Sequence, residues 1–302
     1  MNNDNIRFRN SILGFIIGDA LGVPYEFISK ELMNAHPAKE MIGFGTHQVP
    51  KGTWSDDSSM MLIIMKWLID LNKKSVAINK IGYDELFDLK SLWKNWFHNG
   101  YMTPYKECFD IGYQTKITLL EPELYCKHSL DSDGQGNGAL MRILPFAWLL
   151  TDDDDYNEVV EHVMLKTCEI THGNFASNHF CRKFIRDVRN ARGDRISMID
   201  EIQQEPNSSG WVSDTYKCVM ASSLKSLYFK DPIEAYKNAV LFAVNLGEDT
   251  DTVAAITGGL VGASFNSNCL PYEWEQCIPK LDMIENLITE FYNIYIHKED
   301  IK

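Results

Sequence analysis

Helical periodicity is the feature of this chain that most restricts its fold. Apolar side chains recur three and four residues apart, as at Ile64, Met65 and Leu68, and the alternating pattern typical of strands is rare. We therefore expect an all-α architecture. The spacing predicts helices over residues 8–21, 57–72, 82–97, 105–119, 139–150, 156–171, 174–192, 214–229, 232–245, 251–264 and 281–296.

The chain offers no clear point of division. Its 302 residues are 45% hydrophobic, enough to bury one substantial core and too apolar for a disordered protein. We find no linker rich in Pro, Gly or Ser and no repeat of fixed period, so we expect a single domain over residues 1–302. Two stretches interrupt the helical pattern, Met33–Trp54 and the glycine-rich Asp131–Gly138. Long loops in a helical domain favour a functional role.

Charge and cysteine content exclude several classes of protein. The net charge of −13 disfavours a broad surface for nucleic acid or for an anionic membrane. The most apolar stretch, Met60–Leu71, is shorter than the ~20 residues that span a bilayer. Seven cysteines without a C-x-x-C pair indicate neither a disulfide framework nor a thiolate zinc site. We expect a reduced, cytoplasmic, monomeric protein with no nucleic-acid or membrane partner.

Two predicted helices begin with more carboxylates than a helix cap requires. One follows Gly52-Thr53-Trp54-Ser55-Asp56-Asp57-Ser58, and the other follows Gly247-Glu248-Asp249-Thr250-Asp251-Thr252. Each segment taken alone is also explained as an N-cap, because Ser and Asp are common there. Together they concentrate negative charge that is costly to bury unless a cation neutralises it. The oxygen donors are Ser55, Asp56, Asp57, Asp249, Asp251 and Thr252.

A donor set made only of oxygen, with no adjacent His or Cys, suits Mg²⁺ or Mn²⁺ better than Zn²⁺. Four carboxylates are enough to hold two such ions about 3.5–4 Å apart. Nearly two hundred residues separate the two segments. The predicted metal site therefore requires the fold to bring two distant helix starts together.

Five segments, in this order along the chain, resemble the motifs of the ADP-ribosylglycohydrolase family. They are Gly14…Gly18-Asp19-Ala20-Leu21-Gly22 with Glu26, Gly52-Thr53-Trp54-Ser55-Asp56-Asp57, Gly136-Asn137-Gly138-Ala139-Leu140-Met141-Arg142, Thr171-His172, and Gly247-Glu248-Asp249-Thr250-Asp251-Thr252. Each segment is weak by itself, but five in order over about residues 11–264 make a specific match.

The resemblance implies a compact orthogonal multi-helix bundle with a central cleft. Two Mg²⁺ or Mn²⁺ ions would be held there by the six oxygen donors, with Ser55 in place of the threonine of many relatives. The implied reaction is hydrolysis of the bond between ADP-ribose and a modified protein side chain, with arginine favoured. Hydrolysis of serine-linked or O-acetyl ADP-ribose is one alternative, and ADP-ribose binding without catalysis is another.

Glycoside hydrolysis also needs a proton source for the leaving group and a base for water. The resemblance assigns these tasks to Glu26, which matches a mobile glutamate of the serine-directed relatives, and to Asp110, which resembles an aspartate beside the scissile bond. Without the resemblance, Glu26 is better explained as an exposed residue after Pro24, and Asp110 has the alternative explanation of a carboxylate on a helix face. Asp19 is expected to be a structural partner within the first helices.

Several further residues are candidates for binding the substrate. Successive glycine amides can hold phosphate oxygens, although the spacing here is not that of a dinucleotide-binding loop. The resemblance assigns ADP-ribose contacts to Gly136, Asn137, Gly138 and Met141, as well as to His172 and Trp211. His172 is also explained as a partner of a helix dipole, and Trp211 as a core aromatic. The other histidines and Trp93, Trp96, Trp148 and Trp274 are expected in the core or at the surface.

A phosphatase is an alternative from another enzyme class. Asp249-Thr250-Asp251-Thr252 resembles the D-x-D-x-T nucleophile motif of haloacid-dehalogenase-type phosphatases. That fold needs the motif near the start of the chain, at the end of a strand. Only about 50 residues follow Thr252, so the sequence disfavours this function.

Overall fold

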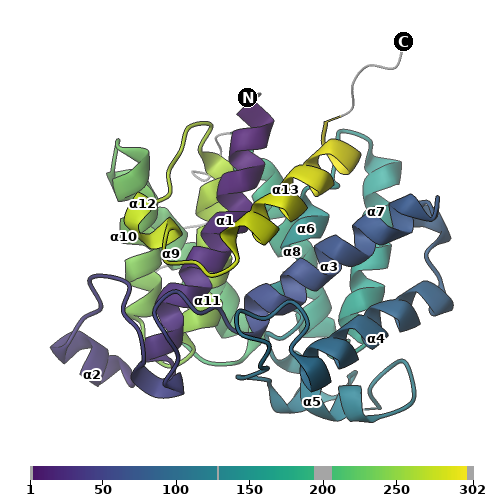
Figure 1. Ribbon diagram of the computed structural model, residues 1–302, viewed down its shortest axis with the longest axis horizontal. Helices are drawn as coiled ribbons and strands as arrows, with labels where there is room; N and C mark the ends of the chain where they lie inside the picture. The colour runs from purple at the N-terminus through teal and green to yellow at the C-terminus, as the bar shows by residue number, and fades with distance from the viewer. Residues whose placement is uncertain (1–2, 128, 194–205, 298–302) are drawn as a thin grey trace.

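The computed structural model describes residues 3–127, 129–193 and 206–297, and within these ranges the regular secondary structure is helical (Figure 1). The exceptions in this part of the chain are two isolated β-bridges, Phe44 with Val49 and Gly136 with Trp211. The prediction of an all-α fold is therefore confirmed. The α-helices are α1 Asn3–Gly22, α2 Lys30–Ala35, α3 Asp56–Lys73, α4 Tyr83–Asn99, α5 Tyr113–Leu120, α6 Leu144–Ala147, α7 Asp154–Glu169, α8 Phe175–Ala191, α9 Val212–Lys225, α10 Pro232–Val244, α11 Thr250–Ser264, α12 Tyr272–Glu275 and α13 Leu281–Tyr295.

Helices α1 and α11 pack against each other at the centre of the molecule (Figure 1). Glycines on α1 allow the two backbones to touch: a Cβ atom on Gly18 would lie 2.2 Å from the carbonyl oxygen of Ala254, and one on Gly22 would lie 2.3 Å from the Cα of Asp251. Such distances leave no room for any side chain. The packing therefore places the end of α1 directly on the start of α11.

Asp19 on α1 fixes the start of α3. Its carboxylate accepts hydrogen bonds from the backbone N–H of Ser55 at 2.9 Å, the backbone N–H of Ser58 at 3.0 Å and the Ser58 hydroxyl. The carboxylate thus satisfies donors that the first turn of a helix leaves without an intrahelical partner. Asp19 is a structural partner, as predicted, and α1 orients the starts of both α3 and α11.

Two predicted helices are shorter than their apolar spacing indicated. Of residues 105–119, only those from Tyr113 onward are helical in α5, because Asp110 adopts a left-handed backbone conformation (φ 58°) that a right-handed helix cannot contain. Residues 139–150 divide into a 3₁₀ turn, Leu140–Arg142, and the short α6, in which Pro145 lacks an N–H to continue the ladder. Helices α2 and α12 were not predicted, because segments so short show no period.

Tryptophan burial, the state of the cysteines and the length of the apolar helices can be compared with the expectations from composition. Trp93, Trp96, Trp148 and Trp274 are buried in the core, as expected. All seven cysteines are free thiols. None of the helices in the described ranges combines the length and the apolar character that crossing a bilayer requires.

Candidate functional site

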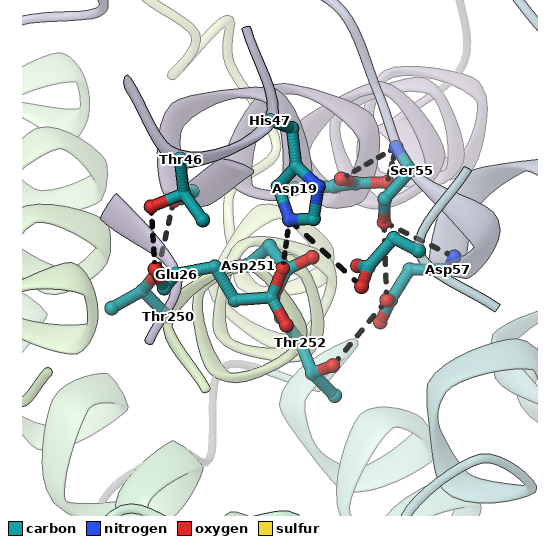
Figure 2. A network of polar contacts seen from close by, with 11 residues as sticks. Asp19, Glu26, Thr46, His47, Ser55, Asp57, Thr250, Asp251 and Thr252 are labelled. Atoms are coloured by element: carbon teal, nitrogen blue, oxygen red, sulfur yellow. Dashed lines mark hydrogen bonds and ion pairs between the residues drawn. The ribbon is translucent and has the colours of Figure 1, made fainter. Parts of the chain in front are cut away.

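The starts of α3 and α11 meet beside the end of α1 (Figure 2). Thr252 Oγ1 donates a hydrogen bond to Asp57 Oδ2 at 3.3 Å, although the two residues are 195 positions apart in the sequence. Ser55 Oγ lies 3.3 Å from the same carboxylate oxygen. The two acidic segments therefore lie side by side, with their hydroxyl groups directed at one carboxylate.

Burial and mutual repulsion strongly perturb the aspartates of this cluster. Desolvation raises the pKa of Asp56, Asp57 and Asp251 well above the ordinary value, and the charges of neighbouring aspartates raise it further. The pKa of Asp249 is raised as well, chiefly by burial. Such an arrangement is costly as bare carboxylates and becomes favourable when a cation shares their charge.

Two carboxylate oxygens of the cluster have no hydrogen-bond donor within the described part of the chain. They are Asp57 Oδ1 and Asp251 Oδ2, and both are buried. Buried polar atoms nearly always have a hydrogen-bond partner in native structures, so the lack of a donor at these two oxygens needs an explanation. A hard divalent cation fits both, because ionised carboxylate oxygens are its preferred ligands.

Glu26 is tied to the start of α11 by the backbone that follows it. The N–H of Phe27 donates to the carbonyl of Glu248 at 2.7 Å, and the N–H of Glu248 donates to the carbonyl of Ile28 at 2.8 Å. Phe27 (φ 63°) and Glu248 (φ 58°) are both left-handed, and strained backbone of this kind gathers at functional sites. The Glu26 side chain is buried, and burial together with Asp251 and Asp249 raises its pKa to about 10.

Asp110 and His47 complete a second polar group around Glu26. Burial, then Asp56 and Glu26, raise the pKa of Asp110 to about 10. The ring of His47 points toward Glu26 (Figure 2): its Nε2 contacts Glu26 Oε2 and lies 3.9 Å from Asp110 Oδ1. One ligand atom from each of the three residues lies within 4.8 Å of the others, so the group could also hold a metal ion.

His47 is a site residue that the sequence did not single out among the histidines. It lies in the 3₁₀ turn Gly45–His47, inside the long loop before α3. That turn packs on Pro24, because Gly45 (φ 61°) has no Cβ atom, which would lie 2.1 Å from the Pro24 carbonyl oxygen. The length of the loop indicated a functional role, but the contact between Gly45 and Pro24 that orients His47 depends on tertiary packing.

A cleft of about 980 Å³ opens over the acidic cluster, a volume typical of a ligand site. Every predicted site residue lines it except Ser55 and Asp251, which form hydrogen bonds with the lining residues Asp57 and Thr252, respectively. Glu26 and Asp110 are not an exposed residue and a helix-face carboxylate, since both lie in this cleft. The predicted residues on its wall are Glu26, Asp56, Asp57, Asp110, Gly136, Asn137, Gly138, Met141, His172, Trp211, Asp249 and Thr252.

The glycine-rich loop forms part of the cleft wall and is anchored to the acidic cluster. Asn137 Nδ2 donates to Thr215 Oγ1 at 3.0 Å and also to Asp249 Oδ2. The Asn137 amide therefore orients a carboxylate of the cluster, a contact that the sequence did not predict. Met141 is buried behind the loop, whereas Trp211 is half exposed at the cleft and is not a core aromatic.

His172 lies behind the glycines of this loop. Its ring is so close to Gly138 that a Cβ atom there would lie 2.6 Å from His172 Cε1. Burial, and then the charge of Arg142, lower the pKa of His172 to about 3. The imidazole is therefore neutral near pH 7 and does not serve as a positive partner for a helix dipole, which requires the charged form.

The D-x-D-x-T segment has the wrong structural setting for a haloacid-dehalogenase-type phosphatase. Asp249 is the N-cap of α11, and the element before it is the helix α10. The nucleophile of such a phosphatase needs the end of a strand. The phosphatase alternative is therefore not supported by the fold.

Comparisons with known proteins agree with these observations. A sequence model of the ADP-ribosylglycohydrolase family matches residues 1–182 and 175–300. An ADP-ribosylarginine hydrolase, Tri1 of Serratia proteamaculans (strain 568), is 25% identical over 311 residues, covering 94% of this chain and 78% of that protein. An ADP-ribosyl-[dinitrogen reductase] glycohydrolase of Rhodospirillum rubrum is 25% identical over 296 residues, covering 92% of this chain and 90% of that protein.

The fold also has a solved counterpart. A chain described as an ADP-ribosylglycohydrolase-related protein complex superimposes with a TM-score of 0.73 and 22% identity, covering 98% of this chain and 100% of that one. The family match spans nearly the whole sequence and includes both acidic helix starts. The chain therefore belongs to the ADP-ribosylglycohydrolase family of hydrolases.

Proposed function

We propose that this enzyme is a metal-dependent hydrolase that releases ADP-ribose from a modified arginine side chain of a protein. The observation that carries the proposal is the meeting of two acidic helix starts beneath a cleft, with Asp57 Oδ1 and Asp251 Oδ2 buried and without donors. Relatives named as ADP-ribosylarginine hydrolases, from Serratia proteamaculans and Pseudomonas putida, support the arginine linkage.

The metal ligands in this proposal are those of the two helix starts, and the metal is a pair of Mg²⁺ or Mn²⁺ ions. Bound there, the ions supply positive charge that attracts and orients the vicinal hydroxyls of the distal ribose. The residues that would hold them are Ser55, Asp56, Asp57, Asp249, Asp251 and Thr252.

Glu26 and Asp110 are suited to the proton transfers. One oxygen of each carboxyl group lies within 4.8 Å of the other, and the mutual repulsion of two buried carboxylates favours a proton on one of them. The protonated member can donate to the departing nitrogen of the guanidine, while the ionised member accepts a proton from the attacking water. The ionised member also favours a cationic guanidinium over a neutral serine hydroxyl, which supports arginine as the modified residue.

The part of the wall that the glycine-rich loop forms is suited to the rest of ADP-ribose. Gly136 and Gly138 leave the backbone open to phosphate oxygens, and Met141 and His172 lie behind them. Trp211 offers a half-exposed aromatic surface on which an adenine ring can stack. We infer that these residues hold the diphosphate, the distal ribose and the adenosine.

A linkage-resolved assay tests the proposal. Purified enzyme with Mg²⁺ or Mn²⁺ is incubated with arginine-linked, serine-linked and O-acetyl ADP-ribose, and free ADP-ribose is measured. We expect release from the arginine conjugate that EDTA abolishes and that Asp56→Ala with Asp251→Ala lowers by several orders of magnitude. The matched control is Asp154→Ala with Asp155→Ala, which alters an equally acidic but exposed helix start and leaves release unchanged.

The same assay separates the alternatives. Release only from serine-linked or O-acetyl ADP-ribose would replace arginine with another leaving group while keeping the same metal chemistry. Binding of ADP-ribose without turnover of any conjugate would mean a non-catalytic ADP-ribose-binding protein. Full activity in EDTA, or in the Asp56→Ala and Asp251→Ala variant, would contradict the metal-dependent reaction.

A further inference from the structure

One ring nitrogen of His172 is directed at the cleft wall. The Nε2 atom lies near both glycines of the loop, 3.1 Å from where a Cβ atom on Gly136 would stand and 3.2 Å from one on Gly138. Within the described part of the chain, Nε2 has no hydrogen-bond partner, whereas Nδ1 lies 2.8 Å from Thr171 Oγ1. Whether Nε2 presents a donor or an acceptor to a ligand depends on the tautomer of the ring.

Arg142 determines whether the Thr171 hydroxyl donates or accepts hydrogen bonds. The guanidinium is fully buried, lies 4.2 Å from the centre of the Trp93 ring and has no carboxylate partner among the described residues. Its Nη2 donates to Thr171 Oγ1 at 2.7 Å. An arginine can only donate, so the Thr171 oxygen accepts here and its own proton remains available for another acceptor.

The only acceptor within reach of that proton, among the described residues, is His172 Nδ1. If Nδ1 carried the ring proton instead, two donors would point at the Thr171 oxygen, and the buried Thr171 hydroxyl would have no acceptor for its proton. Satisfying every group therefore requires an unprotonated Nδ1 and a protonated Nε2. The depressed pKa of His172 keeps the ring in this neutral form.

We propose that Arg142 and Thr171 are positioning residues that hold His172 as the Nε2–H tautomer, so that the ring donates one hydrogen bond to an oxygen of ADP-ribose beside Gly136 and Gly138. The inference rests on the proposed function for the identity of the ligand, but not for the tautomer. The acceptor is a diphosphate oxygen or a hydroxyl of the distal ribose, two groups that present the same chemistry to an N–H donor.

The first test reads the tautomer directly. Protein labelled with ¹⁵N-histidine is studied by NMR at pH 7, and the His172 signals are assigned by their absence in His172→Ala. We expect a proton on Nε2 and none on Nδ1 in the wild type and in Thr171→Ser. In the nearly isosteric Thr171→Val, which lacks the hydroxyl, we expect a mixture of tautomers. A proton on Nδ1 in the wild type, or an unchanged tautomer in Thr171→Val, overturns the proposal.

The second test measures binding by calorimetry, with ADP-ribose, ADP and ribose 5-phosphate as probes. We expect Thr171→Val and His172→Ala each to weaken ADP-ribose binding about tenfold, as the loss of one hydrogen bond predicts, and Thr171→Ser to retain it. Thr171→Val should have no further effect in the His172→Ala background, whereas additive losses would overturn the proposal that Thr171 acts through His172. A parallel loss of ADP affinity identifies the diphosphate as acceptor, and a loss confined to ADP-ribose identifies the distal ribose.

The two tests separate failure of this inference from failure of the proposed function. Wild-type protein that binds no ADP-ribose contradicts the proposed function and the ligand contact together, while the NMR result still decides the tautomer. Normal binding by the wild type together with unchanged affinity in Thr171→Val contradicts only the positioning of His172 by Thr171. Thermal unfolding of each variant shows whether a loss of affinity reflects a loss of fold, and Thr171→Ser provides the folded reference.

Discussion

The acid–base behaviour of single residues in the cleft is decided by how deeply each is buried and by what surrounds it. Glu26 and Asp110 lie among other carboxylates, so the pKa of each is raised to about 10. His172 lies beside a buried arginine, and its pKa falls to about 3. Burial thus favours the protonated form of the acids and the neutral form of the histidine, which suits one carboxyl group of the pair to donate a proton and the histidine to make a fixed hydrogen bond.

The depressed pKa of His172 makes folding stability fall with acid. An unfolded histidine takes up a proton below pH 6.5, whereas the folded ring does so only near pH 3, so this contribution to stability is complete above about 6.5 and is lost as pH falls toward 3. By pH 5 the loss is about 2 kcal/mol. Urea unfolding at pH 7.5 and pH 5 should show the wild type losing about 2 kcal/mol more than His172→Gln. Equal losses would mean that His172 protonates normally in the folded protein.

His47 is expected to hold Glu26 in place. Replacing His47 with Ala removes the contact to Glu26 Oε2 and leaves the carboxyl group free to rotate. We expect kcat to fall about tenfold to a hundredfold, as for a misplaced catalytic group, with a smaller change in KM. His47→Gln, which keeps a donor, should recover part of the rate, and the exposed His179→Ala should match the wild type. Unchanged kcat in His47→Ala would show that the backbone alone positions Glu26.

At the scale of secondary structure, α1 sets the geometry of the site. One carboxylate, that of Asp19, caps α3, and the backbone carbonyl of Gly22 accepts a hydrogen bond from the Thr250 hydroxyl at the start of α11. Helix starts carry partial positive charge and unsatisfied N–H groups, which stabilise nearby carboxylates. Two helix starts that meet, such as those of α3 and α11, can therefore hold several acidic ligands close together.

The contact between α1 and α11 should be intolerant of a single methyl group. In Gly18→Ala the new Cβ atom would lie 2.2 Å from the Ala254 carbonyl oxygen, so the helices must separate. We expect a loss of about 1–3 kcal/mol in the free energy of unfolding, measured in urea. Gly112→Ala is the matched control, because nothing lies within 4 Å of its Cβ position and its backbone has a negative φ. Equal stability of the two variants would contradict the close helix contact.

At the scale of the whole molecule, one cleft gathers segments from most of the chain. Its residues run from Glu26 to Thr252 and come from helix starts and loops that are distant in sequence. We infer from this shared site that residues 1–302 form a single domain. The net charge of −13 is therefore not only a surface property, because several of its carboxylates are buried together under the cleft.

Metal binding should stabilise the entire fold. The ions bind the folded cluster and not the dispersed residues of the unfolded chain, so each bound Mn²⁺ at a hundred times its Kd should add about 2.7 kcal/mol to the free energy of unfolding. In Asp57→Asn we expect higher stability than the wild type in EDTA, because one buried repelling charge is gone. The gain on adding Mn²⁺ should be lost in that variant and retained in the exposed Asp154→Asn. A gain of equal size in Asp57→Asn would argue against the cluster as the metal site.

The sequence by itself determined the helical class and the acidic helix starts, because apolar period and capping chemistry are local properties of neighbouring residues. Tertiary structure decided what no local pattern carries: that α11 lies on α1, that Thr252 meets Asp57, and that His47 turns toward Glu26. It also shortened the helix predicted over residues 105–119, because Asp110 has a left-handed backbone conformation and lines the cleft instead of continuing a helix. Contacts across nearly two hundred residues depend on close backbone packing, which only the folded chain reveals.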